Sequence, residues 1–80
     1  MNYYSVLIHV QKNGKTFLQD IKGLQWQQED LQQGLALVRS EAEQEYHSQY
    51  PGEPIKVIID EENVRQVSAE EFQRLFRPLA

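Results

Sequence analysis

The side chains in this 80-residue chain that could support catalysis are acids, two histidines and a few hydroxyls, with no cysteine. Nucleophilic catalysis by a hydroxyl or thiol needs a serine, threonine or cysteine held beside a base, often within a recognisable local motif. The serines and the threonine lie in no such motif. Ser68 stands three residues before Glu71, a spacing typical of a helix N-cap. The sequence therefore favours a structural role for Ser68 and gives no support for nucleophilic chemistry.

Acidic pairs and one histidine spacing are the remaining candidates for acid–base or metal chemistry. Paired-carboxylate catalysis needs two acids in contrasting environments, one of them removed from water. The acids here cluster in predicted turns and on predicted exposed helix faces, where both members of a pair are solvated. Glu43 and His47 are four residues apart on a predicted helix, but the helix dipole accounts for a histidine near its C-terminus. We therefore predict a protein that is not an enzyme, with no catalytic residues, no cofactor and no metal site.

The charge distribution argues against a nucleic-acid partner. The formal net charge is −4. Residues 1–40 carry four basic and three acidic side chains, whereas residues 41–80 carry four basic and nine acidic side chains. Lys12, Lys15 and Lys22 gather around one predicted turn, but phosphate binding needs a dense cationic surface. We do not expect direct nucleic-acid binding. The longest apolar run is four residues, at 35–38, and the N-terminus lacks signal-peptide features, so we expect no membrane association and a cytoplasmic protein.

An N-terminal hairpin is the clearest predicted element. Apolar residues alternate on either side of Asn13-Gly14, a dipeptide that favours a type I′ turn. Gly23 is expected to end the second strand, and alternation places Leu7, His9 and Leu18 on the face of the sheet away from the core. A two-residue loop predicts the following register: Val10 opposite Phe17, Ile8 opposite Gln19, and Val6 opposite Ile21.

A long helix follows the hairpin. It is predicted to begin near residues 27–29 and to end near His47 or Ser48, before Pro51-Gly52. Its buried stripe recurs at helical spacing and comprises Leu31, Leu35, Val38, Ala42 and Tyr46.

The last third of the chain predicts one strand at residues 55–60, a short fourth strand at residues 64–67, and a helix capped by Ser68 and ended by Pro78. The terminal helix is expected to close an end or edge of the core. We therefore predict a single α+β domain over residues 1–80 with the order β-β-α-β-(β)-α. It is a two-layer sandwich of an antiparallel β-sheet, formed by the hairpin and one or two further strands, packed on one long helix.

Ten residues are candidates for contact with a protein partner. The outer face of the long helix is expected to present Leu37 with glutamines, and Trp26 either joins that face or folds back over the core. The free sheet face contributes two leucines, and the acidic second half contributes glutamates. The candidates are Leu37, Trp26, Gln33, Gln44, Leu7, Leu18, Glu41, Glu45, Glu61 and Glu62.

Three hypotheses follow, because fold alone does not fix function. The first is a small non-catalytic protein-interaction module, of bacterial or phage type, that binds a protein partner through an exposed helix or sheet face. The second is an acidic inhibitor that mimics nucleic acid and blocks a basic enzyme through Glu41, Glu45, Glu61 and Glu62. The third is a homodimeric structural or accessory subunit that pairs through an edge strand or the Leu37 face. The identity of the partner and the oligomeric state are left open.

Overall fold

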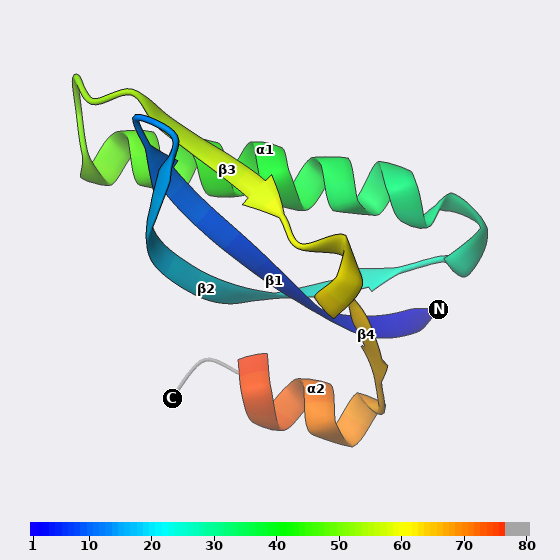
Figure 1. Cartoon of the computed structure of the whole chain (residues 1–80). Coiled ribbons are helices and arrows are strands. Elements are labelled where there is room, and N and C mark those ends of the chain that lie inside the picture. The colour runs from blue at the N-terminus through cyan, green and yellow to red at the C-terminus, as the bar shows by residue number, and fades with distance from the viewer. Residues whose placement is uncertain (77–80) are drawn as a thin grey trace.

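The computed structural model describes residues 1–76 and contains one antiparallel sheet with a helix against each of its faces (Figure 1). Strand β1 spans Asn2–Lys12 and β2 spans Lys15–Trp26. A short 3-10 turn, η1 (Gln28–Asp30), leads into the long helix α1 (Leu31–Gln49). The chain then forms β3 (Ile55–Ile59), the 3-10 turn η2 (Glu61–Asn63), β4 (Arg65–Val67) and α2 (Ala69–Phe76). The predicted order of elements and the α+β class are confirmed.

Strand β1 is the centre of the sheet. It pairs along its whole length with β2 on one side, and on the other side with β3 near its C-terminal end and with β4 near its N-terminal end. Alternate β1 side chains point toward α1 and form the middle of the core together with the apolar stripe of the helix. The largest fully buried side chains are those of Val6, Ile8, Val10 and Val57.

The hairpin turn is confirmed, but the predicted register is wrong. Asn13 and Gly14 have positive φ values of 55° and 79°, as a type I′ turn requires. The register shifts between Val10 and Gln11, so that Gln11 faces Thr16 while Val10 faces Leu18. Phe17 is the extra residue of a β-bulge, and every later β2 side chain points to the opposite face from the one predicted.

Strand β2 runs through Gly23 instead of ending there, which is a second correction. A Cβ atom at Gly23 would lie 2.7 Å from Cγ of Phe76 and 2.8 Å from Cε2 of Phe72. Glycine is therefore required by the close approach of α2 and does not mark the end of the strand. Phe72 also packs on Tyr3, with ring centroids 5.0 Å apart.

Helix α2 consequently lies on the sheet face opposite α1 and covers one end of that face, as Figure 1 shows. The sequence predicts a position at an end or edge of the core, and the contacts with Gly23 and Tyr3 place the helix on the other sheet face instead. Its N-cap is confirmed, since Ser68 Oγ accepts the Glu71 N–H at 3.0 Å. The predicted stop at Pro78 lies outside the described residues. The short fourth strand is confirmed as β4.

Helix α1 ends at Gln49, one residue beyond the predicted end, and begins after η1 at Leu31. Its predicted buried stripe is confirmed, with Leu35, Val38, Ala42 and Tyr46 buried and Leu31 half-buried against the core. Gly34 lies under Trp26, because a Cβ atom there would be 2.8 Å from Cγ of the indole.

Within residues 1–76, none of the helices has the length and apolar character needed to cross a membrane.

Candidate interaction surfaces

The outward edge of β2 is the longest stretch of unpaired strand in the described residues. Its direction follows from the hydrogen bonds of β1. The Asp60 N–H donates to the Leu7 carbonyl at 2.9 Å, so the backbone groups of Leu7 point toward β3. Leu7 is the partner of Ile21 in the β1–β2 register, and this pair is therefore not hydrogen-bonded. The N–H and C=O of Ile21 point away from the sheet, as do those of Gln19 and Gly23.

The side chains along this edge are solvent-exposed at the same positions. Ile21 is 52% exposed, which is high for an isoleucine in the middle of a strand. Gln19, Gly23 and Gln25 are also exposed. The opposite edge of the sheet differs, because Val57 has the equivalent outward backbone direction in β3 and is only 1% exposed. The β2 edge, defined by residues Gln19–Gln25, is therefore the open edge of the sheet.

Asp20 covers the centre of the β2 edge. Its Oδ1 accepts the Ile21 N–H at 2.8 Å, and its Oδ2 accepts the Tyr46 hydroxyl at 2.8 Å. Lys22 Nζ lies 3.2 Å from the same Oδ2 and 2.7 Å from Glu45 Oε2. One carboxylate thus connects the open edge to helix α1.

The ionisation of this cluster follows from burial and hydrogen bonding. Partial burial of the Asp20 carboxyl opposes ionisation, but the Tyr46 hydroxyl, the Ile21 N–H and Lys22 outweigh it, so the pKa of Asp20 is below 3.8. Partial burial also disfavours the charged form of Lys22, but its contacts with Glu45 and Asp20 prevail and raise its pKa above 10.5. Burial and the hydrogen bond to Asp20 raise the pKa of Tyr46 to about 12. Asp20 and Lys22 are therefore ionised, and Tyr46 is neutral, at neutral pH.

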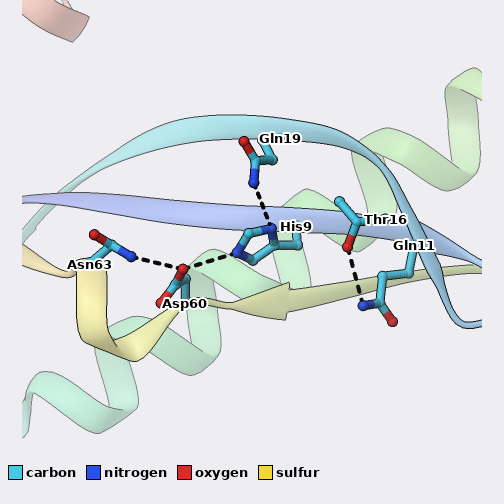
Figure 2. Close-up of polar contacts among 6 residues, drawn as sticks. All are labelled: His9, Gln11, Thr16, Gln19, Asp60 and Asn63. Carbon is cyan, nitrogen blue, oxygen red and sulfur yellow. Dashed lines mark hydrogen bonds and ion pairs between the residues drawn. The ribbon is translucent and has the colours of Figure 1, made fainter.

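A polar network centred on His9 occupies the sheet face opposite α1 (Figure 2). The Gln19 side-chain amide lies 3.2 Å from His9 Nδ1, and His9 Nε2 lies 3.0 Å from Asp60 Oδ2. An amide NH₂ group can only donate, so Nδ1 accepts and Nε2 carries the ring proton. The Asn63 amide donates to the same Asp60 oxygen at 2.9 Å. Hydrogen bonds from His9 and then from Asn63 lower the pKa of Asp60 below 3.8.

The His9 ring is hydrogen-bonded on both sides within this network. Both ring nitrogens of His9 have a protein partner, so the ring orientation is fixed by Gln19 and Asp60. The placement of His9 on the face away from α1 is as predicted. Its contact with Gln19 exists because of the bulge at Phe17, which turns the Gln19 side chain to that face.

Some of the apolar candidate residues lie where the sequence predicts them, and others do not. Leu37 is exposed on α1, at 43%, and Leu7 is half-buried on the sheet face opposite α1, so both lie as predicted. Leu18 lies on the α1 face and packs against the core, because the register is shifted. Trp26 is at the end of β2 and packs against the core, so its placement on the helix is wrong and the alternative, that it folds over the core, is confirmed. Gln33 and Gln44 are exposed on α1.

The structure does not gather the four candidate glutamates. Glu41 and Glu45 line a small pocket of about 100 Å³ against Lys22 and Gly23, beside the β2 edge. Glu61 lines a different groove of about 510 Å³ between α1 and β3, together with Arg39 and Lys56. Glu62 is exposed in η2. Glu41 and Glu45 therefore lie at the opposite edge of the sheet from Glu61 and Glu62. Arg39 and Lys56 line the same groove as Glu61.

No three histidine or acidic side chains among residues 1–76 come together as metal ligands. The chain matches no family model, and comparisons with curated proteins and with solved structures find no match.

Proposed function

We propose that the chain is a non-catalytic protein-interaction module that binds an extended segment of a protein along the β2 edge. The single observation that carries this proposal is the row of outward-pointing backbone groups at Gln19, Ile21 and Gly23, all in exposed residues. An unpaired strand edge accepts an added strand through main-chain hydrogen bonds, while side chains at alternate positions provide selectivity.

The chemistry of the edge supports this mode of binding. The exposed side chain of Ile21 is an apolar contact point, and Gln19 beside it is a neutral hydrogen-bonding group. The edge is also restrained, since Asp20 occupies the Ile21 N–H when no strand is present. This restraint is one of the ways in which proteins protect a sheet edge against unspecific pairing.

A displayed library of twelve-residue peptides, selected on the folded chain, tests the proposal. Selected peptides are synthesised and titrated into ¹⁵N-labelled protein. We expect the largest amide shifts at Gln19, Ile21, Gly23 and Gln25, with much smaller shifts at the even-numbered residues between them. A library without binders, or shifts centred on Leu37 and its neighbours in α1, would contradict binding at the β2 edge.

Two variants sharpen the test. Gln19→Pro removes one outward N–H without removing a bond to β1, because the Gln19 backbone points away from β1. We expect this change to weaken peptide binding at least tenfold. Leu37→Glu alters the exposed face of α1 and serves as the matched control, for which binding is expected to be unchanged.

The acidic-inhibitor alternative stays a prediction. The separation of Glu41 and Glu45 from Glu61 and Glu62 does not favour it. Its test is the capture of a basic nucleic-acid enzyme with an affinity that falls steeply between low and high salt.

A further inference from the structure

We infer that the strand accepted by the β2 edge is β2 of a second copy of this chain, paired antiparallel about a two-fold axis at Ile21. This inference rests on the proposed function, since it names the partner of the same edge. It starts from the sequence of the edge, Leu18-Gln19-Asp20-Ile21-Lys22-Gly23-Leu24, which is self-complementary when it is reversed about its central residue.

The pairing is complementary at its central residues. With Ile21 opposite Ile21 of the second copy, Asp20 is opposite Lys22 of the second copy, and Lys22 is opposite its Asp20. Leu18 meets Leu24 of the second copy on the same face. Gln19 lies opposite Gly23 of the second copy on the other face, where Phe72 and Phe76 of that copy pack over the glycine. Opposite charges directly across an antiparallel pair are favourable, and like charges are not.

The hydrogen-bond pattern selects this register. The backbone groups of Ile21 point outward, so the two copies of Ile21 form a hydrogen-bonded pair. Asp20 and Lys22 then form non-hydrogen-bonded pairs, in which the side chains approach most closely. A two-fold axis at Asp20 or at Lys22 would instead oppose like charges. An axis at Gly23 would place Lys22 opposite Leu24 of the second copy.

Asp20 has a role in both states of the edge. In the single chain its Oδ1 holds the Ile21 N–H, and Tyr46 and Lys22 hold its Oδ2. When the second strand arrives, the carbonyl of Ile21 of the second copy replaces Oδ1 as the acceptor of that N–H. The carboxylate is then free on that side to meet Lys22 of the second copy. The two copies of α1 lie on the same face of the joined sheet, each with its Glu41 and Glu45 beside the junction.

Charge exchange across the axis tests the register. We expect the wild-type mass, measured by light scattering, to rise with concentration from 9.4 kDa toward twice that value. Asp20→Lys alone and Lys22→Asp alone place like charges opposite each other, so each variant is expected to remain at 9.4 kDa. An equimolar mixture of the two variants pairs opposite charges at both positions, and the doubled mass is expected to return.

Cross-linking tests the same axis without changing the charges. The chain has no cysteine, so a single introduced thiol reports only on its own contacts. The two Ile21 Cα atoms of a hydrogen-bonded pair are about 5.5 Å apart, within the range for a disulfide. Ile21→Cys is therefore expected to form a covalent dimer on mild oxidation. Gln19→Cys, whose two copies are more than about 12 Å apart along the strands, is the control that does not.

The outcomes separate this inference from the proposed function. A wild-type chain that stays at 9.4 kDa and an Ile21→Cys variant that does not cross-link would overturn self-pairing. If library peptides still shift the β2-edge amides in that case, strand binding stands and only the identity of the strand is wrong. If they do not, both proposals fall. If the Asp20→Lys and Lys22→Asp variants each double in mass as readily as the wild-type chain does, the Ile21 register would also be overturned.

Discussion

Asp20 accepts the backbone N–H of Ile21, the residue that follows it, at 2.8 Å from Oδ1. The other oxygen of the same carboxylate accepts the hydroxyl of Tyr46, which is 4% exposed in the core. A single side chain therefore occupies one outward N–H of the β2 edge and contacts the C-terminal half of α1. A change at either end of this connection should be measurable at the other.

Replacement of Asp20 by alanine is expected to destabilise the fold and to open the edge. It leaves the buried Tyr46 hydroxyl without its acceptor, which costs about 1–3 kcal/mol of the free energy of unfolding. It also frees the Ile21 N–H, whose hydrogen exchange should become faster. Urea unfolding and amide exchange measure the two effects. Asp20→Asn, which keeps a carbonyl acceptor, is the control and should lose less. An unchanged exchange rate at Ile21 in Asp20→Ala, measured at a concentration where the chain is monomeric, would contradict the assignment.

Tyr46 should titrate apart from an ordinary tyrosine. Its pKa is raised from 10.0 to about 12, because burial and Asp20 both favour the neutral hydroxyl. The unfolded chain loses this proton first as pH rises, so the stability that the hydroxyl contributes is fully present below about pH 10 and is lost toward pH 12. Absorbance of tyrosinate should show a step near pH 12 that Tyr46→Phe removes. A step that persists in Tyr46→Phe would assign it to another residue.

The order of elements is predictable from the sequence because each signal is local. Asn13-Gly14 requires positive φ, the 3.6-residue stripe through Tyr46 requires a helix, and Ser68 with Glu71 marks a helix start. The β2 register is not local in this sense. An inserted bulge residue, Phe17, reverses the facing of every residue after it, and a bulge with an aromatic side chain has no sequence signature as strong as that of a glycine.

The candidate site was missed for the same reason. The predicted β1–β2 register places Ile21 in the core and Asp20 in the solvent. It therefore predicts neither the exposure of Ile21 nor the hydrogen bond from its N–H to Asp20. The available signal was Gln19, a polar residue that the predicted register placed between apolar positions. The structure places it on the other face beside His9, at 3.2 Å. The role of Gly23 could not be predicted either. The glycine is needed because α2 packs closely on it, and the alternation of side chains along β2 carries no information about a helix at residues 69–76.

Gly23→Ala should loosen α2 from the sheet. The added methyl group would stand 2.7 Å from the Phe76 ring and 2.8 Å from the Phe72 ring, so these rings or the helix that carries them must shift. Overpacking of this kind costs about 1–3 kcal/mol. We expect lower stability in urea, together with faster amide exchange in residues 69–76 than in α1. Gln25→Ala, an exposed position two residues along the same strand, is the control, and equal effects of the two changes would contradict a specific contact with α2.

Asp60 should report the contact with His9 directly. The hydrogen bond from His9 is the largest cause that holds the pKa of Asp60 below 3.8, and the Asn63 amide adds to it. The stabilising contribution of the carboxylate is therefore present above pH 3.8 and is lost as the pH falls through the lower, folded value. The ¹³C shift of the Asp60 carboxyl carbon, followed between pH 2 and pH 6, measures that midpoint. His9→Ala is expected to move the midpoint upward toward 3.8, whereas His47→Ala, which removes an exposed histidine of α1, should leave it unchanged. Equal midpoints in the wild type and in His9→Ala would contradict a contribution of His9 to the lowered pKa of Asp60.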